Sequence, residues 1–438
     1  MDQLLFPNLT REIRSITAVQ NVGRVRSITA THVKVSGLQG SASMGDQVVI
    51  NTRNGDAVMG EVVVLDIDFI DVFLETHSEG VSVNDEVILV GALRIAPHDA
   101  WKGRVIDANG APLDGRRLPK GAGSYPLKSP PPNAAMRKPM GERLKTGMTV
   151  FDTFLPLVQG QRLGLFAGSG VGKSTLLSNF AKNISADVIV VAMIGERGRE
   201  LRDFIENTLG EEGLAKSIIV AATSDQSAVQ RRRCAWAAMA IAEYFRDQGQ
   251  HVLLLADSIT RFADAHREVA LSLGEPATMG GYPPSVSALI MALCERAGPG
   301  AYGQGDITAI FSVLVAGSDM DEPVADVLRG VLDGHIVLDR KISERGRFPS
   351  VDVLRSVSRS LPNAATDDEN TLLQSARQML SLYDQIELMV TSGLYTAGSD
   401  MVMDQAISVW PKLDAFMSLQ SPEGISESFN LLRETIED

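Results

Sequence analysis

The stretch RLGLFAGSGVGKSTLL (Arg162–Leu177) predicts a strand, a glycine-rich turn and the start of a helix, in that order. The glycines in the turn permit backbone conformations that other residues resist, so several amide N–H groups can converge on phosphate oxygens. The helix N-terminus adds a favourable partial positive charge. We expect the Lys173 side chain to reach the β- and γ-phosphates and the Ser174 hydroxyl to bind Mg²⁺.

The pattern G-x-x-x-x-G-K-[ST] is broken only at its first position, where this chain has Ala167. A small residue there is a mild departure, and the part that faces phosphate is intact. We therefore expect a nucleoside triphosphate as the ligand. The residues expected to bind it are Ala167, Gly168, Ser169, Gly170, Val171, Gly172, Lys173, Ser174 and Thr175.

Hydrolysis of the bound triphosphate requires a carboxylate that accompanies Mg²⁺, normally at the end of a buried strand. The segment HVLLLAD (His251–Asp257) is an apolar run that ends in an acid, and we expect Asp257 to be a metal-site residue. The next residue is Ser258 rather than a second acid. The base that activates water must therefore come from another segment.

The segment VIVVAMIGERGRE (Val188–Glu200) offers such a base, because Glu196 follows the strand after the phosphate-binding helix. In open α/β folds, ligands bind at this end of the sheet. We expect Glu196 to orient the attacking water and Arg197 to hold the base or contact phosphate. A surface salt bridge between Glu196 and a nearby arginine is the alternative.

A cation is also needed to stabilise the charge that spreads over the transferring phosphoryl group. An arginine in this role is worth about 10³–10⁵ in rate in GTPases. Arg261 in ADSITRFADAHRE and Arg359 in FPSVDVLRSVSRS are both candidates, and the pattern alone does not choose between them.

The flanking regions differ in their periodicity. Residues 19–96 are short β-type runs between turn signals, which predicts a small antiparallel barrel. Residues 97–362 alternate strands and helices, which predicts a mostly parallel sheet, with a Pro/Gly-rich connector over 119–139. Residues 363–438 are helical. In residues 1–18 an apolar stripe predicts a helix that docks a partner or packs on the barrel: Leu5, Leu9, Ile13 and Ile16.

Charge and composition exclude several classes of protein. The formal net charge is −13, with an acidic excess of 12 to 7 over residues 1–95 and of 13 to 3 over residues 363–438. Backbone-driven nucleic-acid binding needs a basic stripe instead. No apolar run approaches the roughly 18 residues of a membrane span, and the two cysteines provide no disulfide framework. We expect a cytosolic protein.

Taken together, several motifs resemble the type III secretion ATPases, and within them those of flagellar export. The resemblance covers about residues 20 to 420 and implies a central RecA-like P-loop domain. It also implies a homo-hexamer with stator-like and central-stalk-like partners, export substrates and their chaperones, held at the inner face of the cytoplasmic membrane. The motifs are FAGSGVGKSTLL, IGERGRELRDF, AEYFRDQG, LLLADSITRFADAHREVAL, GEPATMGGYPPSV, LDGHIVLDR and FPSVDVLRSVSR.

The same resemblance assigns further roles. It implies that Arg359 is an arginine finger that enters the neighbouring subunit's site, and that Phe348 lies against adenine. Tyr282, Pro283 and Pro284 match a loop that faces the central channel of the hexamer. The implied activity is Mg²⁺-dependent ATP hydrolysis that energises export, by unfolding substrates or releasing their chaperones at the membrane export gate.

Three other functions share parts of this pattern with flagellar export. Virulence-type secretion ATPases share all of these motifs. A rotary synthase catalytic subunit fits less well, because the segment after Tyr383 lacks a concentrated acidic run. A hexameric nucleic-acid translocase would need stacking aromatics on a basic barrel, whereas residues 1–95 are acidic and their only aromatics are Phe6, Phe69 and Phe73.

Overall fold

The computed structural model describes residues 19–278, 280–315, 320–421 and 423–437. The helix expected over residues 1–18 lies outside these ranges. The chain divides into two compact units between Arg94 and Ile95, and the short stretch Gln226–Val229 groups with the first unit.

The first unit is a closed antiparallel barrel with strand order β1-β2-β5-β4-β3-β6. Alternating Val and Ile side chains from all six strands fill its interior. Gly60 of β4 is required by space, since a Cβ there would lie 2.4 Å from Val72 Cγ1 on the paired strand. The barrel predicted from the sequence is confirmed. Its strands are β1 (Val22–Ile28), β2 (His32–Ser36), β3 (Asp46–Asn51), β4 (Ala57–Leu65), β5 (Ile70–Leu74) and β6 (Glu86–Ala92).

The second unit contains a nine-stranded sheet of order β19-β18-β12-β17-β15-β13-β14-β8, with β16 paired to β17. All pairs along this order are parallel except β18 with β19. The mostly parallel sheet predicted from alternating strands and helices is therefore confirmed. Its strands are β8 (Arg104–Asp107), β12 (Arg162–Ala167), β13 (Val188–Glu196), β14 (Ser217–Thr223), β15 (His251–Asp257), β16 (Gly298–Pro299), β17 (Asp306–Leu314), β18 (Gly334–Leu338) and β19 (Val351–Ser358).

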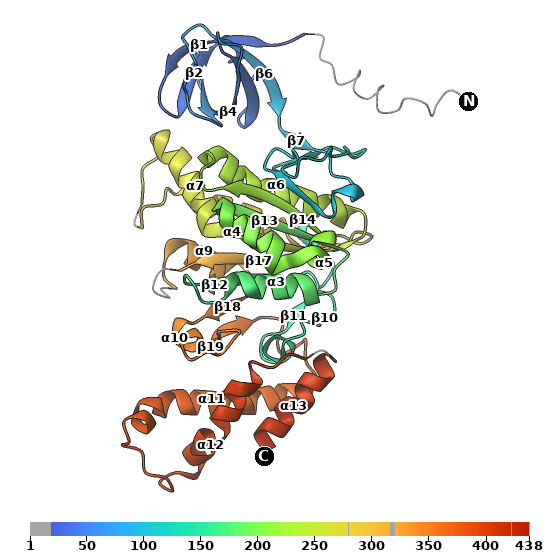
Figure 1. Cartoon of the computed structure of the whole chain (residues 1–438), viewed down its shortest axis with the longest axis vertical. Helices are drawn as coiled ribbons and strands as arrows, with labels where there is room; N and C mark the ends of the chain where they lie inside the picture. The colour runs from blue at the N-terminus through green and yellow to red at the C-terminus, as the bar shows by residue number, and fades with distance from the viewer. Residues whose placement is uncertain (1–18, 279, 316–319, 422, 438) are drawn as a thin grey trace, which may run out of the picture. The chain divides into compact units, whose positions relative to one another are not determined.

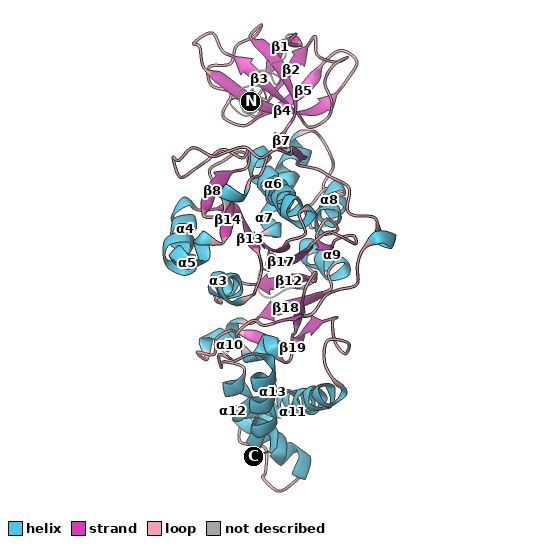
Figure 2. Ribbon diagram, turned by 90° about the vertical axis from the view of Figure 1, so that its right-hand side faces the viewer, coloured by secondary structure: helices cyan, strands magenta, loops and turns pink. Residues whose placement is uncertain are grey.

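The helices cover both faces of this sheet (Figure 2). Crossovers between parallel strands are right-handed, so connections that run toward β14 lie on one face and those that return lie on the other. The first group is α3 (Lys173–Asn183), α4 (Gly198–Asp203), η3 (Phe204–Leu209) and α5 (Gly210–Ala215). The second group is α6 (Ala228–Asp247), α7 (Ile259–Ser272), α8 (Ser285–Cys294) and α9 (Pro323–Val331).

Short elements lead into the sheet and along its edge. Residues 119–139, expected as an extended connector, contain only β9 and η2 as regular elements, and the Trp101 indole donates to Pro119 O at 2.6 Å. The short elements are β7 (Arg94–Ile95), η1 (Asp99–Trp101), β9 (Tyr125–Pro126), η2 (Ala134–Met136), β10 (Arg143–Leu144), α2 (Thr149–Asp152), β11 (Leu157–Val158) and α10 (Arg340–Glu344).

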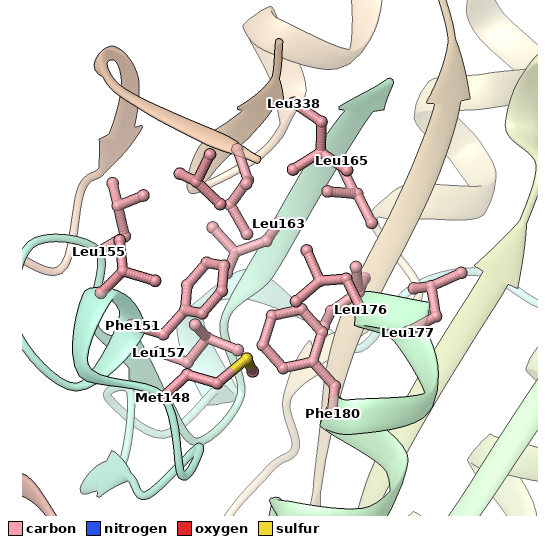
Figure 3. Close-up of a cluster of buried hydrophobic side chains, with 14 of the residues drawn as sticks. Met148, Phe151, Leu155, Leu157, Leu163, Leu165, Leu176, Leu177, Phe180 and Leu338 are labelled. Carbon is pink, nitrogen blue, oxygen red and sulfur yellow. The ribbon is translucent and has the colours of Figure 1, made fainter. Parts of the chain in front are cut away.

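An apolar cluster lies beneath the helix that follows the glycine-rich turn. Phe180 of α3 meets Phe151 of α2 edge-on, with ring centroids 5.0 Å apart, and Met148 lies beside both rings (Figure 3). Leu163 and Leu165 of β12 belong to the same cluster. Each fully buried side chain of this size contributes about 1.5–3 kcal/mol, so the cluster holds the strand and the helix on either side of the turn.

The C-terminal segment is the helical domain that the sequence predicts: α11 (Asp367–Thr391), α12 (Met401–Phe416) and α13 (Ile425–Glu437), near the C-terminus in Figure 1. Thr366 begins α11 with a capping box shared with Glu369. Arg377 of α11 donates to the carbonyls of Phe154 and Val353, at 3.1 and 3.0 Å. These bonds fasten the helices to the sheet. Among the described residues, no helix is long and apolar enough to span a membrane.

Candidate functional site

The glycine-rich turn joins the carboxyl end of β12 to the first residue of α3, Lys173. Gly170 and Gly172 have φ values of 77° and 90°, which side chains rarely allow. The buried Ser350 hydroxyl donates to the Val171 carbonyl at 2.7 Å and fixes the turn from outside. Within the part of the chain that the structure describes, and apart from the adjoining residues, no atom lies within 4 Å of a Cβ built on Gly170, which leaves space beside the turn for a phosphate.

Lys173 and Asp257 form an ion pair at the base of this turn. Asp257 ends β15 directly after Ala256, and Ala256 pairs with Phe311, the residue before Ser312, on the intervening strand β17. Ser312 is fully buried, and its hydroxyl donates to the same carboxylate oxygen at 2.7 Å. The structure thus brings together two residues that lie 84 positions apart. Ser312 was not identified from the sequence, because its contact with Asp257 depends on the order of the strands in the sheet.

Glu196 lies at the carboxyl end of β13, the next strand along the sheet. The pairing of β13 with β14 shifts by one residue between Ile194 and Glu196. Gly195 has a φ of 67° at this irregularity, and a Cβ there would lie 3.3 Å from Arg261 Cδ. The backbone irregularity keeps Glu196 facing the same pocket as Asp257, with only 7% of the residue exposed.

The charge of Glu196 is controlled by its neighbours. Burial, a hydrogen bond with Glu200 and the Asp257 charge raise the pKa of Glu196 to about 7. Lys173 and Arg261 oppose this increase. Because the pKa lies near neutral pH, this carboxyl can both accept and release a proton there, which general-base catalysis needs.

Arg261, not Arg197, is the arginine that contacts Glu196. Its Nε lies 3.3 Å from Glu196 Oε1, and a second guanidinium nitrogen donates to the Gly195 carbonyl. The exposed Arg197 side chain lies 3.3 Å from Glu200 Oε1 instead. Arg197 still lines the pocket, so a phosphate contact is open to it.

These residues surround one pocket of about 960 Å³. All of the residues expected to bind nucleotide from 167 to 175 line it except Val171, whose side chain is buried. Thr260 and Glu322 are lining residues that the sequence patterns did not single out. The volume is in the range of pockets that hold nucleotide-sized ligands.

Phe348 lies at the edge of the glycine-rich turn. A Cβ built on Gly172 would be 3.4 Å from Phe348 Cδ1, and the Phe348 residue is 52% exposed. A large aromatic side chain half in solvent is ill-suited to a core position. Its placement beside the turn is compatible with stacking on a planar ligand.

Arg359 lies toward the end of the parallel strands that is opposite the glycine-rich turn. The preceding residue, Ser358, pairs with Gly334 at the start of β18. Leu338 at the other end of β18 pairs with Ala167 beside the turn. Gly334 and Leu338 are four positions apart, about 13 Å at the rise of a strand. The exposed Arg359 side chain donates to the Arg329 carbonyl at 3.3 Å. Within one chain, Arg359 is therefore separated from Lys173 and Glu196.

The loop before α8 contains Tyr282, Pro283 and Pro284. The Tyr282 hydroxyl donates to Asp264 Oδ1 of α7 at 2.9 Å, and the Arg267 guanidinium lies 4.8 Å from the ring centroid. These contacts fasten the loop to the helix that also carries Arg261.

Two known family models match most of the chain from residue 147 onward. The model described as "ATP synthase alpha/beta family, nucleotide-binding domain" matches residues 147–358. The model described as "T3SS EscN ATPase C-terminal domain" matches residues 365–433. The boundary between the matches falls where the sheet gives way to α11.

Full-length relatives match as well. A protein of Caulobacter vibrioides named "Flagellum-specific ATP synthase" is 44% identical over 98% of this chain and 99% of its own length. A "Type 3 secretion system ATPase" of Xanthomonas euvesicatoria is 39% identical over 95% of this chain and 93% of its own.

Solved structures agree with the sequence relatives. The assembled ATPase EscN of enteropathogenic E. coli superposes with a TM-score of 0.87 at 35% identity, covering 94% of this chain and all of that one. A second structure holds EscN in complex with its central stalk EscO. The resemblance noted in the sequence is confirmed: the chain belongs to the family of flagellum-specific ATP synthases and type III secretion ATPases.

Proposed function

We propose that this protein hydrolyses ATP with Mg²⁺ to energise export of flagellar, type III substrates. One observation carries the proposal: Lys173, Asp257 and Glu196 converge on one pocket at the carboxyl ends of β12, β15 and β13, although β17 lies between β12 and β15. Family membership supplies the export role, since relatives over the whole chain are flagellum-specific.

The glycine-rich turn would hold the phosphates through its backbone N–H groups, and Lys173 would move from Asp257 to the β- and γ-phosphates. Mg²⁺ usually takes one or two protein oxygens together with phosphate oxygens. The Ser174 hydroxyl and the buried Asp257 carboxylate supply that set. When bound, the ion would neutralise charge that develops on the transferred group.

Glu196 would act as the base. Its ionised carboxylate accepts a hydrogen bond from the attacking water and orients it toward the γ-phosphate. Burial and the hydrogen bond with Glu200 raise its pKa to about 7, and Arg261 opposes this increase. Arg197 is proposed as an auxiliary phosphate contact at the mouth of the pocket, and Phe348 as the surface on which adenine stacks.

The cation that completes the site would come from another subunit. Arg359 lies at the far edge of its own sheet, on the surface, and a neighbour in a ring could receive it. We propose a homo-hexamer in which Arg359 of one chain stabilises the phosphoryl group bound by the next. The loop with Tyr282, Pro283 and Pro284 would then face the central channel.

We further propose a central-stalk-like partner, on the precedent of EscN with EscO. A regulatory stator-like protein, export substrates and their chaperones would complete the assembly. The expected location is the cytoplasm, at the inner face of the cytoplasmic membrane near the export gate. Virulence-type secretion is less favoured, because the type 3 secretion system ATPase of Xanthomonas euvesicatoria is 39% identical, whereas the flagellum-specific relative of Caulobacter vibrioides is 44% identical. Identifying the apparatus proteins that co-purify with the chain would distinguish the two systems.

The test is steady-state ATP hydrolysis with purified variants. Glu196→Gln should bind ATP normally and hydrolyse it at least about tenfold more slowly, because general-base catalysis is worth about 10²–10⁴. Lys173→Ala should weaken ATP binding itself. Glu206→Gln, which removes an exposed carboxylate paired with Arg202, is the matched control and should change neither quantity. Near-normal turnover by Glu196→Gln would remove this residue from the role of base.

A further inference from the structure

A short segment, Arg345–Ser350, joins the phosphate-binding turn to the C-terminal helices. At one end, the Ser350 hydroxyl donates to the Val171 carbonyl within the turn. Two residues earlier, the Phe348 ring lies beside Gly172. A displacement of this segment would therefore move both the support of the turn and the aromatic ring at its edge.

The other end of the segment is held by α12. Arg347 is only 6% exposed, and its guanidinium donates to the Val351 carbonyl at 2.7 Å. Its Nε lies 3.1 Å from Asp414 Oδ1, and Arg345 lies 3.4 Å from the same oxygen. A buried guanidinium is costly unless a carboxylate is placed against it. Asp414 therefore sets where Arg347, and with it the segment, comes to rest.

Arg345 contacts α11 as well as α12. Its guanidinium lies 5.3 Å from the Trp410 ring centroid and 3.8 Å from Glu387 on α11. Trp410 stacks on Tyr383 of α11, with ring centroids 4.3 Å apart. The cluster borders a cavity of about 620 Å³. Trp410 thus lies where a movement of the segment changes the surroundings of an indole ring.

We propose that Asp414 is a positioning residue for the nucleotide site. Through Arg347 it holds Phe348 and Ser350 in the place that ATP requires, so nucleotide affinity depends on the position of α12. Coupling of binding free energies is reciprocal. A partner that shifts α12 would change ATP affinity, and ATP would stabilise one position of α12. This inference rests on the proposed function, because it takes the pocket to be an ATP site.

The test compares full-length variants with ATP and ADP. Asp414→Asn should raise KM for ATP about three- to tenfold, which lies within the range of mutations that act along a coupled network, and change kcat less than twofold. Asp414→Glu should restore most of the affinity. Asp384→Asn is the control: this acid lines the same cavity on α11 and, within the described residues, pairs with no arginine of the segment. It should leave KM unchanged.

Trp410 provides a second readout that loss of stability alone would not produce. Titration with ADP should change tryptophan emission in the unmodified protein and in Asp384→Asn, and the change should disappear in Trp410→Phe. In Asp414→Asn the change should occur at about three- to tenfold higher ADP. Asp414→Asn leaves the buried Arg347 without its counter-charge, so its melting temperature should fall, and the titrations are made on folded protein at a temperature below that transition.

A folded Asp414→Asn protein with unaltered KM would overturn the proposal, as would an equal effect of Asp384→Asn. Failure of the proposed function looks different. In that case the unmodified protein would not hydrolyse ATP, or Lys173→Ala would bind ATP as tightly as the unmodified protein.

Discussion

The guanidinium of Arg261 lies against the carboxylate of Glu196, with Nε 3.3 Å from Oε1. The two residues come from α7 and β13, 65 positions apart in the chain. Arg261 lowers the pKa of Glu196, whereas burial and Glu200 raise it. The proposed base is thus held near neutrality by opposing neighbours, and each neighbour can be removed separately.

The first prediction concerns the removal of Arg261. A base must be ionised, so kcat/KM should fall as pH drops through the pKa of Glu196, about 7. Arg261→Gln removes a cation that favours the ionised form, which raises this pKa. The acidic limb of the profile should therefore move up by about one pH unit. A profile that keeps its shape while its plateau falls about a thousandfold would identify Arg261 as a transition-state cation instead.

The second prediction is that removal of Glu200 moves the acidic limb of the kcat/KM profile in the opposite direction, to lower pH. Glu200 raises the pKa of Glu196 through a hydrogen bond, and its own pKa is lowered by the same contact. Glu200→Gln should therefore let Glu196 ionise more readily, and the acidic limb should move to lower pH. The kcat/KM profile measures this directly. A shift to higher pH would show that Glu200 does not act on the base in this way.

The third prediction tests the serine behind the metal-site carboxylate. Ser312→Ala removes the buried hydroxyl that donates to Asp257 at 2.7 Å. Loss of such an outer contact costs about 10- to 100-fold in metal affinity in known sites. The Mg²⁺ concentration for half-maximal hydrolysis should rise by at least about tenfold. Ser356→Ala, which alters a buried serine of β19, should leave the Mg²⁺ dependence unchanged.

The fourth prediction concerns stability away from the pocket. Arg296 and Glu243 form a buried, two-bonded ion pair at 2.8 and 2.7 Å, and Arg296 also donates to the Leu127 carbonyl. Glu243→Gln leaves the guanidinium buried without its counter-charge, which should cost about 3–5 kcal/mol. Calorimetry should show a lower melting temperature. The double variant Glu243→Met, Arg296→Met should recover much of the loss, because no buried charge remains.

The parts of the site that the sequence predicts are those encoded locally. The turn after β12 follows from glycine spacing and a lysine at the start of a helix, and the barrel follows from alternating Val and Ile. Contacts across the sheet are different. Ser312 was missed because β17 lies between β12 and β15 in space but follows both in the chain.

The direction of side chains is the second reason why the site in the structure differs from the site expected from the sequence. Arg197 adjoins Glu196 in the chain, and from the sequence we expect it either to hold the base or to contact phosphate. The strand ends at Glu196 and α4 begins at Gly198, so the intervening residue turns outward to Glu200. Arg261 reaches the base from a different helix. The local sequence alone does not predict which way the Arg197 side chain points or that a residue of α7 reaches Glu196 instead.

The last prediction is that each active site requires two subunits. In its own chain, Arg359 lies at the other end of the strands from Lys173, because β19 runs antiparallel to β18 and ends beside the start of β18. Arg359→Ala should lose about 10³–10⁵ in kcat while ATP affinity stays nearly unchanged, since the contact forms in the transition state. Specific activity of the unmodified protein should rise with protein concentration as rings form.

A mixing experiment separates the two locations for this arginine. Arg359→Ala and Lys173→Ala should each be inactive alone. In rings assembled from both, some interfaces pair an intact Lys173 from one chain with an intact Arg359 from its neighbour, so part of the activity should return. Arg355→Ala, which removes an exposed arginine four positions earlier on β19, is the matched control and should stay active without mixing. No recovery in rings shown to contain both variants would mean that Arg359 does not act on a neighbouring site.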